Sequence, residues 1–196
     1  MITFADVTTP GSCAGNYVIT RTWTATDNCL NAATCVQTIT VHDITAPVIT
    51  CPADVVINCE DSSVPASTGT ATAIDNCDAA PVITFADMTT PGSCAGNYVI
   101  TRTWTATDNC LNASTCVQTI TVHDVTAPVI TCPADITLNC EDPSVPASTG
   151  TATAIDNCDA APVITFADVT TPGSCAGNYV ITRTWTATDN CLNAAT

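Results

Sequence analysis

The stretch TRTWTATDNC occurs three times without a change, at residues 20–29, 101–110 and 182–191. Its alternation of Thr with Arg, Trp, Ala and Asp has the period of two that is typical of a β-strand. The final Asp-Asn-Cys indicates a turn, because Asp and Asn side chains hydrogen-bond to their own backbone. The stretch therefore predicts one long strand and the turn after it, repeated along the chain.

The repetition extends through the whole sequence. The phrase ITFAD begins at Ile2, Ile83 and Ile164, which are 81 residues apart. We divide the chain into the last part of a first repeat, one complete repeat and most of a third, at residues 1–44, 45–125 and 126–196. Because the first and third repeats are incomplete, we expect the chain to be a segment of a longer array.

The complete repeat reads as short strands separated by Pro, Gly, Asn and Asp, with no helix signal. The expected strands are residues 49–59, 68–75, 81–90, 97–108 and 116–124. In the long strand Trp104 shares a face with Arg102, and we place this face in the core of an all-β fold. Trp23 and Trp185 hold the same position in the other copies. We expect Arg102 to pack on the Trp ring and to meet a carboxylate such as Asp87; ligand binding by Arg102 is the alternative.

Composition indicates an extracellular protein. The chain has 14 Cys in 196 residues, with an even number in the complete repeat, as in disulfide-bonded modules of oxidising compartments. The net charge of −15 and the absence of Lys argue against nucleic-acid binding, which requires cationic side chains. No stretch approaches the roughly 20 apolar residues of a membrane span. Met1 begins no signal peptide, since no basic segment or long apolar run follows it.

Three motifs carry a family resemblance: TAPVITCPADVVINC (45–59), TATDNC (105–110) and CVQTITV (116–122). They resemble the hyalin-repeat (HYR) module, and the 81-residue unit as a whole is similar to the Cys-rich immunoglobulin-like repeats of giant surface adhesins in gliding Bacteroidota. The resemblance implies tandem immunoglobulin-like β-sandwich modules that serve as extracellular stalks or adhesive fibres without catalysis. One position departs from the pattern, since Leu111 stands where hyalin-type hairpins often have Gly.

Cysteine pairing can be ranked by topology but not chosen from the sequence alone. If successive strands run up and down within one module, cysteines at like ends should pair. The expected pairs are Cys51–Cys116, Cys59–Cys94 and Cys77–Cys110, followed by Cys140–Cys175 and Cys158–Cys191, with Cys132 unpaired. The rival is Cys110–Cys116 across the last hairpin.

Acidic residues gather where the same topology places the joints between modules. They are Asp43, Asp75, Asp78 and Asp108 at one joint and Asp124, Asp156, Asp159 and Asp189 at the next. Calcium is the candidate cofactor, because Ca²⁺ takes about six to eight oxygen ligands and would stiffen a short linker. The alternative is that these residues form turns and solubilise the chain, with no cofactor. A zinc site is disfavoured because no CxxC pair occurs.

The functional expectation is mechanical. No Ser–His–Asp arrangement and no glycine-rich phosphate loop occurs, so we expect no enzymatic activity. We expect a structural segment of an extracellular filament or adhesin stalk, a stiff disulfide-stabilised rod. Its partners would be the neighbouring repeats and other copies of the filament. The alternative is a multivalent array, in which each module binds surface glycans or another ligand weakly and tandem copies supply avidity.

Overall fold

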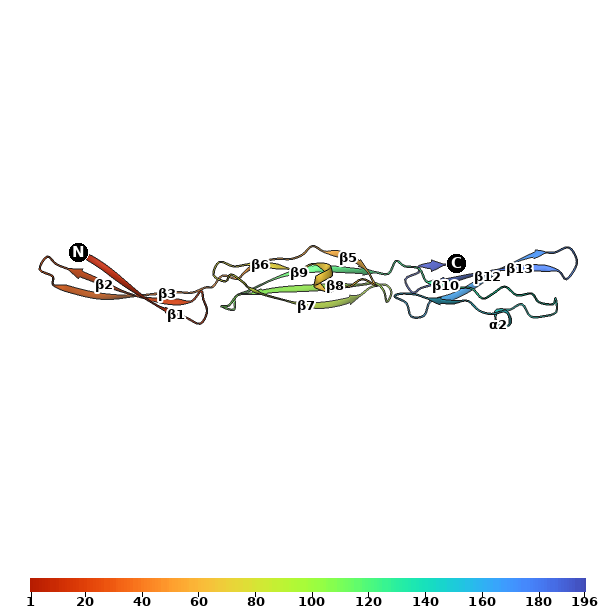
Figure 1. The fold of residues 1–196 in the computed structure, drawn as a ribbon, viewed down its shortest axis with the longest axis horizontal. Helices are drawn as coiled ribbons and strands as arrows, with labels where there is room; N and C mark the ends of the chain where they lie inside the picture. Colours follow the sequence, from red (N-terminus) through yellow and green to blue (C-terminus); the bar gives the residue numbers. More distant parts are fainter. The chain divides into compact units, whose positions relative to one another are not determined.

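The structure is a computed structural model that describes residues 1–196, and it is all-β apart from two one-turn helices. Its strands form five sheets (Figure 1). The chain divides into two compact units, each made of three segments. The first unit comprises residues 1–54, 68–87 and 101–118, and the second comprises residues 55–67, 88–100 and 119–196.

The first unit contains an antiparallel sheet in the order β1-β2-β3 and a small antiparallel pair, β4 and β6. These strands are β1 (Ile2–Pro10), β2 (Tyr17–Thr26), β3 (Ala32–Val41), β4 (Val48–Thr50) and β6 (Thr72–Ile74). In the register of β1 and β2, Asp6 lies opposite Arg21 and Phe4 lies opposite Trp23. Because side chains two positions apart share a face, an ion pair and an aromatic pair are neighbours on this sheet.

Four strands from the middle of the sequence form one sheet in the order β5-β9-β8-β7. They are β5 (Val55–Asn58), β7 (Val82–Pro91), β8 (Tyr98–Thr107) and β9 (Ala113–His123). Strand β5 runs parallel to β9, with Val55 opposite Ile120. The part of this sheet that belongs to the second unit contains a buried apolar cluster of Ile100, Ile120 and Val122.

The rest of the second unit contains an antiparallel pair, β10 and β11, and a sheet in the order β12-β13-β14. The strands are β10 (Val129–Thr131), β11 (Thr153–Ile155), β12 (Val163–Pro172), β13 (Tyr179–Thr188) and β14 (Ala194–Ala195). Asp168 lies opposite Arg183 and Phe166 opposite Trp185. The same sequence therefore adopts the same pairing here as in β1 and β2.

Helices occur where the sequence predicts none. These are α1 (Pro65–Thr68) and α2 (Pro146–Thr149). Each begins at a Pro, whose fixed φ suits the first helical position. Helix α1 takes up the start of the strand predicted at residues 68–75, which is reduced to β6, and the strand predicted at 49–59 is divided into β4 and β5. With four residues each, neither helix is long enough to cross a membrane.

The predicted alternation of strand faces is confirmed in β8. From Ile100 onward its residues alternate between buried and half-buried, and Trp104 is buried. Trp185 is also buried, but Trp23 is only half-buried, so the prediction of a core Trp is wrong for this copy. Residues 1–44 form the β1-β2-β3 sheet and no second sheet of their own. A Trp on a sheet that lacks a covering sheet keeps more of its surface in water.

Candidate functional site

Four disulfides cross-link the chain, and three of them join different copies of the repeated sequence. Cys13–Cys110 and Cys51–Cys116 lie in the first unit, whereas Cys59–Cys158 and Cys94–Cys191 lie in the second. Cys51–Cys116 is the pair that topology predicts. The other three join residues 97 or 99 positions apart, which exceeds the 81-residue repeat.

The remaining predicted pairs are wrong. They are Cys59–Cys94, Cys77–Cys110, Cys140–Cys175 and Cys158–Cys191, and the rival Cys110–Cys116 does not form either. The prediction assumed that each repeat closes its own disulfides. Instead, a Cys of one copy meets the Asp-Asn-Cys turn of the following copy, at Cα–Cα distances of 5.2, 6.2 and 5.3 Å. These distances lie in the range that a disulfide spans.

Six cysteines are free, and a single rule accounts for them. They are Cys29, Cys35, Cys77, Cys132, Cys140 and Cys175, of which Cys132 was predicted to be unpaired. Each lies 81 residues from a bonded cysteine, and its own partner position falls outside residues 1–196. Cys77, for example, corresponds to Cys158, whose partner Cys59 corresponds to a position before residue 1. The same bonds therefore form in every copy for which both positions are present.

Three aspartates of the first unit bring their carboxylates together, and we call them the first cluster. Candidate ligand oxygens of Asp43, Asp75 and Asp108 lie within 4.8 Å of one another. Asp43 is 7% exposed and Asp108 is 4% exposed. Asp75 and Asp108 each begin an Asp-Asn-Cys turn, and their Oδ1 atoms accept backbone N–H bonds from the turn. The Asp108 turn therefore both presents a carboxylate and supplies a disulfide cysteine, Cys110.

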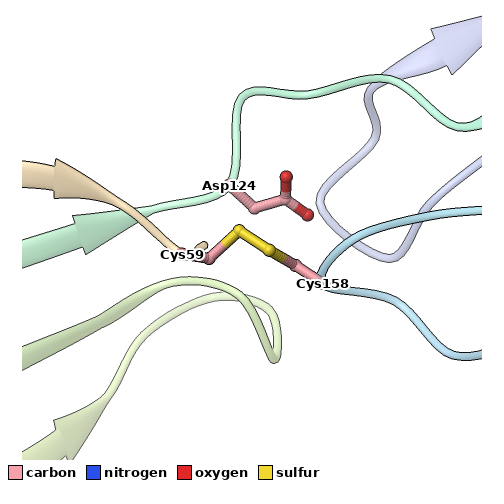
Figure 2. A group of neighbouring side chains, drawn as sticks. All are labelled: Cys59, Asp124 and Cys158. Atoms are coloured by element: carbon pink, nitrogen blue, oxygen red, sulfur yellow. A yellow bond between two sulfur atoms is a disulfide. The ribbon is translucent and has the colours of Figure 1, made fainter. Parts of the chain in front are cut away.

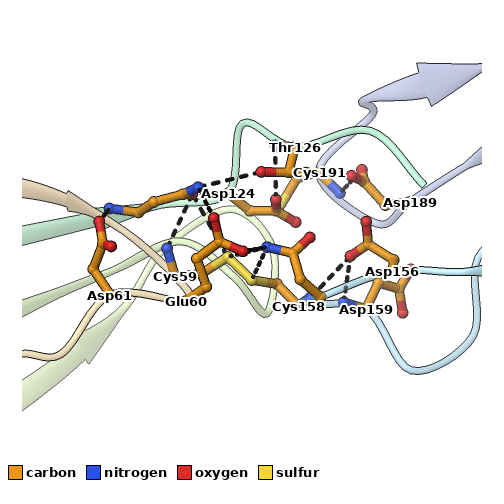
Figure 3. Close-up of a disulfide and its surroundings, with 12 residues drawn as sticks. Cys59, Glu60, Asp61, Asp124, Thr126, Asp156, Cys158, Asp159, Asp189 and Cys191 are labelled. Carbon is orange, nitrogen blue, oxygen red and sulfur yellow. Dashed lines mark hydrogen bonds between the residues drawn. A yellow bond between two sulfur atoms is a disulfide. The ribbon is translucent and has the colours of Figure 1, made fainter. Parts of the chain in front are cut away.

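The second unit contains the equivalent second cluster. Oxygens of Asp124, Asp156 and Asp189 again lie within 4.8 Å of one another, and Figure 3 shows them beside the Cys59–Cys158 disulfide. Asp124 is 4% exposed. Its carboxylate lies next to the two sulfurs (Figure 2). Those sulfurs are bonded to each other, so they offer no thiolate to a metal.

Several buried oxygens of the two clusters have no hydrogen-bond donor. These atoms are Oδ2 of Asp43, Asp75, Asp124 and Asp156. The Oδ1 atoms of Asp43 and Asp124 do accept a bond, from the backbone N–H two residues later, at 3.2 Å. A buried carboxylate oxygen without a donor is costly, because it has lost its water and gained no partner.

Two of the eight predicted calcium ligands lie outside the clusters. Asp78 accepts hydrogen bonds from the backbone N–H groups of Ala80 and Asn109, at 3.0 and 2.9 Å. Asp159 makes the equivalent bonds in the third copy. Each of these residues therefore ties two turns of one copy together. The structure brings the other six predicted residues together in two groups of three.

The sequence reasoning missed the residues that hold Asp43 and Asp124 in place. The Asn97 side-chain oxygen accepts the Asp124 N–H at 2.7 Å, and a Cβ on Gly96 would lie 2.5 Å from the Asp124 Cβ. In the first unit, the Asn16 side-chain oxygen accepts the Asp43 N–H, and a Cβ on Gly15 would lie equally close to the Asp43 Cβ. The signal was present as the tripeptide Ala-Gly-Asn, which recurs at residues 14–16, 95–97 and 176–178.

Electrostatics differ between aspartates that have donors and those that lack them. The pKa of Asp124 is raised, first because burial removes the carboxylate from water and then because of nearby negative charges. Those charges are on Asp156, Asp189 and Asp159. Burial also favours the neutral form of Asp108, but hydrogen bonds from Asn112, Cys110 and Leu111 together outweigh it and lower the pKa. Asp108 receives bonds at both oxygens, whereas Asp124 receives a bond at Oδ1 only.

Arg102 has the structural contacts that the sequence predicts. It is 1% exposed, and its Nε and Nη2 donate to the two oxygens of Asp87 at 2.7 Å. Its Nη1 donates to the Thr68 hydroxyl at 3.0 Å. The guanidinium carbon lies 4.7 Å from the Phe85 ring centre and 5.8 Å from that of Trp104. The guanidinium is therefore engaged by its own neighbours within the first unit.

Comparison with known proteins assigns no family. No protein-family model matches the chain, and no curated protein sequence matches it.

Proposed function

We propose that the chain is a load-bearing segment of an extracellular filament or adhesin stalk, built from tandem immunoglobulin-like modules. The modules would be the sequence repeats at residues 1–44, 45–125 and 126–196. An all-β fold with several sheets and four disulfides supports this reading. The partners would be the neighbouring repeats and other copies of the filament, and we propose no enzymatic activity.

The observation that carries the proposal is a short covalent route through the long chain, which the disulfides between copies create. The route passes from Cys13 to Cys110, back along the backbone to Cys94, and then to Cys191. It uses the backbone between residues 94 and 110 and bypasses most of the residues from 13 to 191. A pulling force would therefore act on two disulfides and a short backbone segment. It would spare the strand-to-strand hydrogen bonds on which an uncross-linked β-module depends.

A second disulfide reinforces the connection between the last two copies. Cys59–Cys158 joins residues 45–125 to residues 126–196, as Cys94–Cys191 does. Two covalent links at different points oppose rotation as well as separation of the parts that they join. This is the property that a stiff stalk requires.

The chemistry of the chain supports an extracellular location. Disulfides form and persist in oxidising surroundings and are rare in the reducing cytosol. Their number here and the net charge of −15 suit a soluble surface structure exposed to such surroundings.

Single-molecule stretching from Met1 to Thr196 tests the proposal. With disulfides intact, the shortest covalent route runs through Cys13, Cys110, Cys94 and Cys191 and contains about 33 backbone steps, so the contour length should stop near roughly 120 Å. After reduction, the whole chain of 196 residues should extend to roughly 650–700 Å.

A variant makes the measurement quantitative. In Cys13→Ser/Cys110→Ser, the shortest route passes through Cys51–Cys116 and Cys94–Cys191, and it should lengthen to about 77 backbone steps, roughly 260 Å. An oxidised parent chain that extends as far as the reduced one would contradict the load-bearing role.

A further inference from the structure

The two acidic clusters share a feature that turns and solubility do not explain. In each, a nearly fully buried Asp contributes its carboxylate to the group and has one oxygen without a hydrogen-bond donor. These residues are Asp43, 7% exposed, and Asp124, 4% exposed. A second oxygen without a donor comes from Asp75 in the first cluster and from Asp156 in the second. The pattern recurs in two units that are built from different residues of the chain.

Neighbouring groups do not neutralise these oxygens. The chain contains three Arg and no Lys, and each Arg is paired with an Asp outside the clusters: Asp6, Asp87 or Asp168. Hydrogen-bond donors reach only Oδ1 of Asp75 and Asp124, whereas Asp108 receives bonds at both of its oxygens. Three carboxylates within 4.8 Å repel one another strongly away from bulk water. A bound cation would remove the repulsion and would give the oxygens without donors a partner.

We propose that each cluster binds one Ca²⁺ ion, held by Asp43, Asp75 and Asp108 in the first unit and by Asp124, Asp156 and Asp189 in the second. Two oxygens bound to one Ca²⁺ at about 2.3–2.6 Å lie at most about 5 Å apart, a limit that both clusters satisfy. The inference goes beyond the mechanical role and does not depend on it.

The donor set selects the class of ion. It consists of carboxylate oxygens, which suit hard cations, and it contains no imidazole or thiolate for zinc. Backbone carbonyls and water would complete the coordination shell of Ca²⁺, which tolerates irregular geometry, whereas Mg²⁺ demands a regular octahedron. The competing explanation is a shared proton within the cluster, in which Asp124 stays neutral.

Calorimetric titration of the oxidised chain with Ca²⁺, in buffer freed of metal by a chelator, tests the proposal. We expect two ions per chain, with dissociation constants of about 10⁻⁴–10⁻³ M, as for extracellular calcium modules. Asp43→Asn and Asp124→Asn should each reduce the stoichiometry from two to one. The control Asp135→Asn removes an equal charge from an exposed position and should leave it at two.

Thermal unfolding separates metal binding from a merely structural role. Without metal, Asp124→Asn should melt at a higher temperature than the parent, because it removes a buried charge that lacks a partner. In millimolar Ca²⁺ the order should reverse, because only the parent gains binding energy at that cluster.

The shared-proton explanation predicts no heat of binding, no response of melting to Ca²⁺ and a stabilising Asp124→Asn under all conditions. That result would overturn the proposal. It would leave the disulfide-limited contour length unchanged, so the two proposals can fail independently.

Discussion

Gly96 lies so close to Asp124 that a Cβ on the glycine would be 2.5 Å from the Asp124 Cβ. Asn97, the next residue, accepts the Asp124 N–H at 2.7 Å. A loop of one sequence copy thereby fixes a buried carboxylate at the end of the same copy. Real Cβ atoms do not approach this closely, so the position excludes every residue except Gly unless Asp124 moves.

Gly96→Ala should therefore destabilise the chain by about 1–3 kcal/mol, the usual cost of forcing extra volume into a packed site. Denaturant unfolding measures the loss. Gly15→Ala should have the same effect through Asp43 and serves as an independent repeat of the experiment. A Gly96→Ala chain that is as stable as the parent would mean that the loop does not hold Asp124.

Leu111 adopts φ +70°, and the equivalent Leu30 and Leu192 have φ +65° and +73°. A left-handed conformation costs a non-glycine residue about 1–2 kcal/mol, and Leu111 is 83% exposed, so it gains little from packing. Leu111→Gly should therefore stabilise the chain by about 1 kcal/mol, measured by denaturant unfolding. The control is Leu138→Gly, because Leu138 does not have a positive φ. This substitution should destabilise the chain. A loss of stability in Leu111→Gly would show that the leucine side chain has a role of its own.

The Arg–Asp pair occurs in two environments, which supplies a natural control. The Arg102 side chain is 2% exposed, whereas that of Arg21 is 25% exposed in the same type of pair. Arg102→Met should cost about 1–3 kcal/mol, because it removes buried hydrogen bonds to Asp87 and Thr68 and the packing of the guanidinium on Phe85. Arg21→Met should cost less, because water reaches the Arg21 side chain as well as its partner Asp6. Equal losses in the two variants would mean that burial does not set the strength of the pair.

Much of the fold follows from local pattern, and the exceptions have physical causes. The strands predicted at residues 81–90 and 97–108 correspond to β7 and β8, because alternation over many residues is a strong signal. The pairing of Arg102 with Asp87 was likewise predicted, because an Arg on the core-facing side of a strand needs a carboxylate for its head group. Helix α1 was missed, since four residues give no helical period and the only sign is a Pro at the first position.

The residues of the candidate site could be predicted from the sequence, but the disulfide pairing could not. Like-end pairing within one module finds Cys51–Cys116, where Cys51 follows β4 and Cys116 lies in β9 of the same copy. It fails for Cys59, because a loop at the end of a module can reach either its own copy or the next one. Nothing in a single repeat distinguishes the two. The pairing depends on how successive copies contact one another, which local sequence does not encode.

Acid should weaken the pair of Asp168 and Arg183. The hydrogen bond from Arg183 lowers the pKa of Asp168 below its ordinary value of 3.8. A carboxyl with a lowered folded pKa contributes stability above its unfolded pKa and loses it as the pH falls through the folded value. Titration of the Asp168 carboxyl by NMR should therefore give a midpoint below 3.8, and Arg183→Met should raise it. An unchanged midpoint in Arg183→Met would show that the ion pair does not persist in solution.

Disulfide mapping tests the connectivity on which the mechanical role depends. Peptides from the unreduced protein should contain the links Cys13–Cys110, Cys59–Cys158 and Cys94–Cys191. Alkylation before reduction should label the six free cysteines, and alkylation after reduction should label all 14. In a chain extended by one further copy of the 81-residue repeat at the C-terminus, Cys132, Cys140 and Cys175 should become protected. Each would then have a partner equivalent to that of its counterpart 81 residues earlier, which is Cys51, Cys59 or Cys94. If these three cysteines stayed reactive in the extended chain, the bonding rule would not propagate from copy to copy.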